Sequence, residues 1–203
     1  MKKRDLEIRL QQIPPPPNPK VHLEQYQTPA PIAADILYNA YILGDIKDNS
    51  IIDLGCGTGI FSVGASLLGA KSVTGIDIDA ESIKIAKHYA TTHNLEIDYI
   101  TSNITEQTKS TDTIIMNPPF GAQKSHKNAD RIFLEVALSH STITYSLHLS
   151  DTLDFLQKIT AALDSTITHT KTYQWPLKAQ YHFHEKLTKT ITVDLLRIQK
   201  NSI

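Results

Sequence analysis

Apolar positions along the chain alternate between helical spacing and short runs that end at glycine or at polar residues. Helices are predicted over residues 5–12, 31–43, 60–70, 80–94, 129–141 and 151–163, and strands over residues 50–55, 72–78, 97–103, 111–117, 142–150, 165–175 and 189–199. Such alternation is typical of a mostly parallel sheet with helices on both faces. The last two strands have no helix between them, so we expect them to pair antiparallel. The predicted fold is an α/β, Rossmann-like, seven-stranded sheet with a C-terminal hairpin.

The N-terminal segment differs in composition from the rest of the chain. The predicted first helix is followed by "IPPPPNPK", residues 13–20, which favours polyproline II. We expect this stretch to act as a stiff spacer that holds the helix off the core. A chain of 203 residues suits one domain, so residues 1–203 are predicted to form a single domain, with residues 1–30 as an arm and residues 31–203 as its core.

Composition narrows the class of protein further. The sequence has no apolar run long enough to span a bilayer, and its basic first residues lack the apolar centre of a signal peptide. A single cysteine, Cys56, excludes an intrachain disulfide and a zinc site built from cysteines. We therefore expect a cytoplasmic protein that binds no membrane and no metal.

Charge is distributed unevenly, although the net charge is only -1. Between Asp35 and Asp112 there are eleven acidic and five basic residues, whereas between Lys171 and Lys200 there are six basic and two acidic residues. Such asymmetry can mark a side that faces a polyanion. Scattered, solvated lysines explain the same counts equally well.

The first predicted strand ends in a glycine loop, "DLGCGTG", residues 53–59. A dinucleotide-binding loop reads G-x-G-x-x-G, but its last glycine would fall on Ile60 or Ser62. An acid directly before the loop, Asp53, suits a cationic ligand better than a pyrophosphate. S-adenosylmethionine (SAM) carries an ammonium and a sulfonium group, which Asp53 could complement directly or through water.

The next two strands also end in polar residues. Asp77 could accept hydrogen bonds from both hydroxyls of a ribose, and Asn103 could bind the amine of an adenine. Ligands of open α/β sheets bind at the carboxyl ends of the strands. The three strand ends therefore predict a SAM site, against the alternative of a tight strand–helix turn with incidental acids.

The fourth predicted strand ends abruptly in Asn117, Pro118, Pro119 and Phe120. Two prolines fix the backbone and supply no N–H group. The Asn117 side-chain oxygen and the Pro118 carbonyl could accept both hydrogens of an exocyclic amine, and Phe120 could stack on its ring. This arrangement would orient the amine towards a methyl donor, so catalysis would rest on orientation and electrostatics.

The two motifs together resemble the class I amino-methyltransferases that modify adenine N6, cytosine N4 or glutamine N5. More specifically, the chain is similar to the methyltransferase-like protein five family, which methylates adenine N6 in small-subunit rRNA. Beyond "DLGCGTG" and "IIMNPPFG", the similar segments are "LEQYQT", "TYSLH" and "YHFHEKLTKTITVDLLRI". The resemblance implies the class I methyltransferase fold.

The resemblance also implies a set of site residues and a partner. The cofactor-binding residues would be Gln25, Tyr26, Thr28, Asp53, Gly55, Gly57, Thr58, Gly59, Ile60, Asp77, Ile78, Asn103, Ile104 and Asn117, and residues 117–120 would be catalytic. The family usually has Asp where this chain has Asn103, so we expect a modest change in cofactor affinity. Eukaryotic members pair with a small zinc-binding protein of the Trm112 type. We expect the third strand, "IDYIT", to be the exposed edge that such a partner covers.

The leading functional hypothesis is an RNA adenine-N6 methyltransferase. Its RNA contacts are predicted at Lys124, Lys127, Phe120, Tyr181, Phe183, His184 and Lys186. Tyr181 and Phe183 could equally well pack within the hairpin. Three alternatives stay open: a protein glutamine-N5 methyltransferase, a DNA adenine-N6 methyltransferase, and a non-catalytic RNA-binding module.

Overall fold

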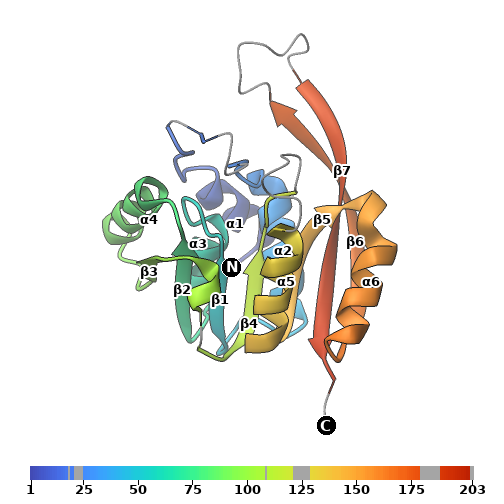
Figure 1. Cartoon of the computed structure of the whole chain (residues 1–203). Coiled ribbons are helices and arrows are strands. Elements are labelled where there is room, and N and C mark those ends of the chain that lie inside the picture. The colour runs from blue at the N-terminus through green and yellow to red at the C-terminus, as the bar shows by residue number, and fades with distance from the viewer. Residues whose placement is uncertain (18, 21–24, 108, 121–128, 179–187, 202–203) are drawn as a thin grey trace.

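The computed structural model describes residues 1–17, 19–20, 25–107, 109–120, 129–178 and 188–201. Its seven-stranded sheet has the order β3-β2-β1-β4-β5-β7-β6 (Figure 1). The strands are β1 (Ser50–Leu54), β2 (Ser72–Asp77), β3 (Asp98–Thr101), β4 (Thr111–Met116), β5 (Ser141–Leu149), β6 (Ser165–Lys178) and β7 (Thr188–Lys200). Strands β1 to β5 pair in parallel, and β7 pairs antiparallel with both β5 and β6. The predicted fold is confirmed, including the antiparallel hairpin at the end.

Helices cover both faces of the sheet. They are α1 (Lys3–Leu10), α2 (Ala30–Ile42), α3 (Ile60–Leu67), α4 (Ala80–Thr92), α5 (Ala129–His140) and α6 (Leu153–Ala162). Side chains of α1, α2 and α3 share one buried cluster with β1, β4 and β5, and side chains of α5 and α6 form a second cluster with β1, β2, β4 and β7. The two clusters therefore lie on opposite faces, as expected for alternating side chains in a sheet.

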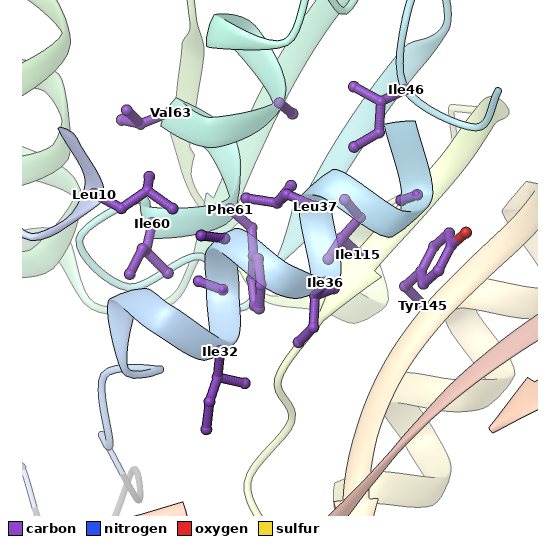
Figure 2. Close-up of a cluster of buried hydrophobic side chains, with 14 of the residues drawn as sticks. Leu10, Ile32, Ile36, Leu37, Ile46, Ile60, Phe61, Val63, Ile115 and Tyr145 are labelled. Atoms are coloured by element: carbon purple, nitrogen blue, oxygen red, sulfur yellow. The ribbon is translucent and has the colours of Figure 1, made fainter. Parts of the chain in front are cut away.

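The larger cluster is a close-packed core between helix α2 and the sheet. Figure 2 shows Leu37 of α2 beside Phe61 of α3, with Ile115 of β4 to their right in this view. Leu37 and Ile115 are almost completely buried. Burying a side chain of this size contributes about 1.5–3 kcal/mol, so this cluster fixes the ends of β1 and β4 relative to α3.

The N-terminal arm corrects one sequence-based expectation. Leu6, Leu10 and Ile13 are all at most 3% exposed, and they belong to the same core cluster as α2. The expectation that residues 13–20 hold the first helix off the core is therefore wrong. Leu6 and Leu10 lie on one face of α1, and Ile13 follows the end of the helix. Together they form an apolar surface that needs a partner surface.

The observed ends of two elements differ from the predicted ends. The third strand ends at Thr101 because the Asn103 side chain accepts hydrogen bonds from the Thr105 N–H and hydroxyl, each at 3.1 Å. That cap starts a short 3-10 helix, Ile104–Glu106, so the strand stops at Thr101 instead of at the predicted residue 103. The last helix begins at Leu153, after a 3-10 turn at Ser150–Thr152.

The two edges of the sheet differ. Strand β3 is one edge, as predicted, and its Ile100 is 41% exposed. Strand β6 is the other edge, and its hairpin partner β7 pairs with β5. The last residue of β5, Leu149, pairs with Val193, whereas β7 already begins at Thr188, so the start of β7 lies beyond the carboxyl end of β5. The hairpin β6–β7 consequently extends past the carboxyl edge of the sheet (Figure 1).

A buried ion pair ties the hairpin to the rest of the domain. The Arg197 Nε and Nη2 atoms of β7 donate to the two carboxylate oxygens of Asp45 at 2.8 and 3.0 Å. The Tyr145 hydroxyl of β5 donates to the same carboxylate at 2.5 Å. Asp45 lies between α2 and β1, so this cluster joins three parts of the chain that are distant in sequence.

Candidate active site

The carboxyl ends of β1, β2 and β4 open on one pocket. Its cavity of about 350 Å³ is lined by Pro16, Gln25, Tyr26, Gln27, Thr28, Gly55, Cys56, Gly57, Thr58, Ile60, Phe61, Asp77, Ile78, Ser82, Asn103, Ile104, Thr105, Asn117, Pro119, Ile132 and Phe133. The structure thus brings together most of the predicted cofactor-binding residues. Asp53 and Gly59 are absent from the lining.

The glycine loop wraps around the end of β1 in backbone conformations that favour glycine. Gly55, Gly57 and Gly59 have φ values of 75°, 53° and 90°. A Cβ atom on Gly59 would lie 2.3 Å from the Tyr99 hydroxyl, which leaves no room for another side chain. The Gly57 N–H donates to the Asp77 carboxylate at 2.7 Å, so the loop is held against the end of β2.

Asp77 is fixed in place at the edge of the pocket. One carboxylate oxygen accepts the Gly57 N–H and the other accepts the Asp79 N–H at 2.8 Å. Burial raises the pKa of Asp77, and the backbone hydrogen bonds from Asp79 and Gly57 act in the opposite direction. Each oxygen keeps a further lone pair, so a pair of ribose hydroxyls would find acceptors already positioned.

Asp53 does not have the direct role suggested by the sequence. It is 1% exposed, and one carboxylate oxygen accepts the N–H and hydroxyl of Ser62 at 2.8 and 2.6 Å. The other oxygen is buried and has no hydrogen-bond partner among the described residues. Asp53 therefore binds the first turn of α3 behind the loop, and direct contact with a cationic ligand in the pocket is excluded in this arrangement.

This burial gives a pH-dependent contribution to stability. Burial raises the pKa of Asp53 to about 7 from an ordinary value of 3.8. Between these pH values the folded protein keeps a proton that the unfolded chain releases. The stabilising contribution of Asp53 is therefore fully present below about pH 4 and is lost as pH rises through about 7.

The Asp53→Asn variant lacks this titrating group, so its stability should depend less on pH. As pH rises from 5 to 8, its free energy of unfolding should fall by about 2 kcal/mol less than that of wild type. Urea unfolding at both pH values measures this, and parallel losses would contradict it.

Asn103 lies in the pocket wall with its amide oxygen already engaged. That oxygen accepts both hydrogen bonds from Thr105 that cap the 3-10 helix. The expectation that it meets an adenine amine is therefore wrong in this rotamer. The amide nitrogen is the group left to face a ligand, and it is a donor.

The tip after β4 presents a buried acceptor. The Asn117 Nδ2 atom donates to the Thr28 hydroxyl at 3.2 Å and to the Tyr26 carbonyl at 3.5 Å. The Asn117 Oδ1 atom is buried and has no partner among the described residues. An unpaired buried acceptor costs about 1–3 kcal/mol, so a donor from a ligand would be bound favourably here.

The aromatic residue of the tip is supported by the hairpin. Phe120 is half-buried, and its ring meets Trp175 of β6 edge-on, with centroids 6.2 Å apart and planes at 86°. Trp175 is 1% exposed, so it is a fixed support. Pro119 lines the pocket, whereas Pro118 and Phe120 lie next to it along the chain.

Several residues of the predicted RNA-binding site fall where the structure gives no description. Lys124, Lys127, Tyr181, Phe183, His184 and Lys186 lie outside the described residues, so their RNA contacts stay predictions. The expected absence of a metal also stays a prediction. Among the described residues, no helix is long and apolar enough to cross a membrane.

Sequence reasoning missed part of the pocket wall. Ile132 and Phe133 of α5 line it, and Phe133 lies so close to Gly55 that a Cβ atom there would be 2.9 Å from its ring. Cys56 also lines the pocket, and burial raises its pKa well above the ordinary value. This agrees with a packing role for the thiol. No spacing in the sequence links α5 to the glycine loop.

Comparison with known proteins identifies the family. The model of the methyltransferase small domain matches residues 33–149. The Danio rerio protein named rRNA N(6)-adenosine-methyltransferase METTL5 is 36% identical over 204 residues, which cover 97% of this chain and 98% of that protein. The chain belongs to the METTL5 family.

Solved structures agree with this membership. The PH1948 protein of Pyrococcus horikoshii, described as a candidate RNA methyltransferase, has a TM-score of 0.92 and 37% identity over 100% of this chain and 99% of that chain. Magnesium protoporphyrin IX methyltransferase from Synechocystis, solved with bound SAM, has a TM-score of 0.66 and 15% identity over 98% of this chain and 91% of that chain. That second likeness shows a shared fold. The METTL5-family chain is thus a class I, SAM-dependent methyltransferase.

The pocket residues fit SAM. Bound SAM supplies an electrophilic methyl group on its sulfonium. Asp77 offers acceptors for the ribose, the glycine loop allows close approach of the backbone, and Ile78 with Ile104 offers apolar contact for a base. The Asn117 Oδ1 atom, which has no partner among the described residues, is an acceptor in the same pocket wall.

Proposed function

We propose that this METTL5-family chain methylates the N6 amine of an adenosine in RNA, and that the RNA is small-subunit rRNA. The observation that carries the proposal is the Asn117 side chain. Its amide nitrogen is anchored by Thr28 and Tyr26, while its buried oxygen has no partner within the described part of the chain. An exocyclic amine is the donor that this oxygen suits. The rRNA adenosine activity in the name of the Danio rerio relative supports the same choice.

The tip would activate the amine by orientation. An adenine amine is a weak nucleophile because its lone pair is delocalised into the ring. If Asn117 Oδ1 and the Pro118 carbonyl accept its two hydrogens, the lone pair is directed into the pocket. No strong general base is needed, because the nitrogen becomes acidic once it has gained a methyl group and loses its proton to water. Phe120, supported by Trp175, would stack on the base for about 1–3 kcal/mol.

The RNA would approach from the carboxyl edge of the sheet. A base must be unpaired or flipped out to reach a tip at this depth. The hairpin β6–β7 projects past the same edge, and its sequence is basic. Its predicted contacts, together with Lys124 and Lys127, would bind the phosphates on either side of the flipped base.

A Trm112-type partner is proposed for the opposite edge. Among the described residues, strand β3 ends the sheet and pairs with β2 on one side, and it carries the exposed Ile100. An uncovered edge strand invites pairing with another chain. Binding there would leave the hairpin edge available to RNA.

Methylation of purified rRNA tests the proposal. The chain, alone and with a Trm112-type partner, is incubated with small-subunit and large-subunit rRNA and methyl-labelled SAM. Label at N6 of one adenosine in the small-subunit rRNA is the expected result. Label on large-subunit rRNA alone would contradict the subunit assignment. Label on a glutamine of an added protein extract would support the glutamine-N5 alternative in place of the proposal. Equal activity and equal stability of the chain with and without the Trm112-type partner would contradict the proposed interface at β3.

A further inference from the structure

Two side chains from the N-terminal segment meet on a single carboxylate next to the pocket. The Lys20 Nζ atom donates to Asp79 Oδ1 at 2.5 Å, and the Gln25 Nε2 atom donates to Asp79 Oδ2 at 2.8 Å. The Lys20 backbone N–H in turn donates to the Gln25 side-chain oxygen at 2.9 Å. Gln25 is therefore held between Lys20 and Asp79, with both ends of its amide engaged.

Asp79 is a rigid anchor for these bonds. Its side chain is 4% exposed, and it caps α4 by accepting from the Ser82 N–H at 3.4 Å. It also accepts from the Ser82 hydroxyl at 2.8 Å. Its backbone N–H also binds Asp77, the acid at the end of β2. Burial alone would raise the pKa of Asp79, but the hydrogen bonds from Lys20, Gln25 and Ser82 hold it well below its usual range. The carboxylate is thus charged at neutral pH.

The residues held by this anchor cover the pocket. Gln25, Tyr26 and Thr28 line it, and Tyr26 and Thr28 also contact the Asn117 amide. Lys20 does not line the pocket. Its effect on a ligand must therefore act through Asp79 and Gln25.

We propose that Lys20 is a positioning residue for the cofactor, because its ion pair with Asp79 holds residues 25–28 over SAM. Without the pair, the covering residues spend less time in the arrangement that binds ligand. The apparent dissociation constant rises as the fraction of competent protein falls. Lys20 also lies 3.3 Å from Glu81, but that carboxylate is 65% exposed and adds little. The proposal concerns cofactor binding alone, so it stands whether or not RNA is the substrate.

The test measures SAM binding to the purified chain by calorimetry. Lys20→Met keeps most of the apolar side chain and removes its charge, and we expect it to weaken SAM binding about tenfold. Asp79→Asn keeps a capping oxygen for α4 and removes the carboxylate. In that background, Lys20→Met should have almost no further effect, because the two changes remove the same interaction.

Two controls separate positioning from general damage. Lys84 is an exposed lysine on α4 outside the pocket lining, so Lys84→Met should leave SAM affinity within twofold of wild type. Without SAM, Lys20→Met should unfold at nearly the same temperature as wild type, because the Lys20 side chain is 35% exposed and Asp79 keeps its hydrogen bonds from Gln25 and Ser82. An unchanged SAM affinity in Lys20→Met would overturn the proposal. So would a tenfold loss that persists in the Asp79→Asn background.

Discussion

Replacing Asn117 by alanine is expected to lower kcat by roughly 10²–10³-fold while SAM binding changes far less. The side chain supplies the buried oxygen that would orient the acceptor amine in the proposed reaction, and no described residue binds that oxygen. Alanine cannot accept a hydrogen bond, so the loss falls on the chemical step. Single-turnover methylation of RNA with saturating SAM measures it, together with SAM affinity by calorimetry.

Thr28→Val is the matched variant for this prediction. It removes the hydroxyl that accepts from Asn117 Nδ2 at 3.2 Å but leaves the Asn117 oxygen in place. Its kcat should fall less than that of Asn117→Ala, because the amide keeps its Tyr26 contact. Near-normal kcat in Asn117→Ala would show that the amine is not oriented by this oxygen. A loss confined to SAM affinity would assign Asn117 to the cofactor instead.

Replacing Arg197 by methionine is expected to lower the free energy of unfolding by about 3–5 kcal/mol. The Arg197 and Asp45 side chains are 11% and 8% exposed, and removal of the guanidinium leaves the Asp45 carboxylate buried with the Tyr145 hydroxyl as its remaining side-chain donor. Removing one member of a buried pair costs far more than the pair itself contributes. Urea unfolding at neutral pH measures the change.

Arg131→Met provides the control for this second prediction. Arg131 pairs with Glu135 at 2.7 Å on the surface of α5, where the two side chains are 55% and 40% exposed. A surface pair of this kind contributes about 0.5 kcal/mol or less, so the variant should unfold almost like wild type. Equal losses in the two arginine variants would show that burial of the Asp45 pair is not what makes it important.

The ends of strands β1 and β4 could be predicted because glycine or proline interrupts an apolar run there. Glycines after β1 and prolines after β4 end apolar runs abruptly, and parallel strands bring such ends to one edge. Asp77 and Asn117 could therefore be assigned to one site from the sequence alone. The antiparallel hairpin followed equally directly from two β-rich runs with no helix between them.

The direction of a side chain was harder to predict. Asp53 was assigned to the ligand because it precedes the glycine loop, but its carboxylate turns towards Ser62 in the first turn of α3. Asn103 likewise uses its oxygen to cap a 3-10 helix. In both cases a nearby backbone N–H competes for the acceptor, and the outcome depends on local geometry that spacing does not encode.

The N-terminal arm shows a different kind of error. The run of prolines favoured a spacer that keeps the first helix away from the core. The apolar residues Leu6, Leu10 and Ile13, which are buried, indicated the opposite. The contribution of Ile132 and Phe133 to the pocket had no comparable signal. It depends on how α5 packs across the sheet, which is a long-range property.

The contact between Phe120 and Trp175 limits how freely this enzyme can change its target. If the hairpin binds RNA as proposed, its exchange between related enzymes during evolution would be a direct way to change the RNA sequence that is recognised. Here Trp175 in the stem of that hairpin also packs against Phe120, the residue proposed to stack on the target base. Inheritance of a foreign hairpin would therefore disturb the catalytic tip, and the two segments are expected to diversify as one unit.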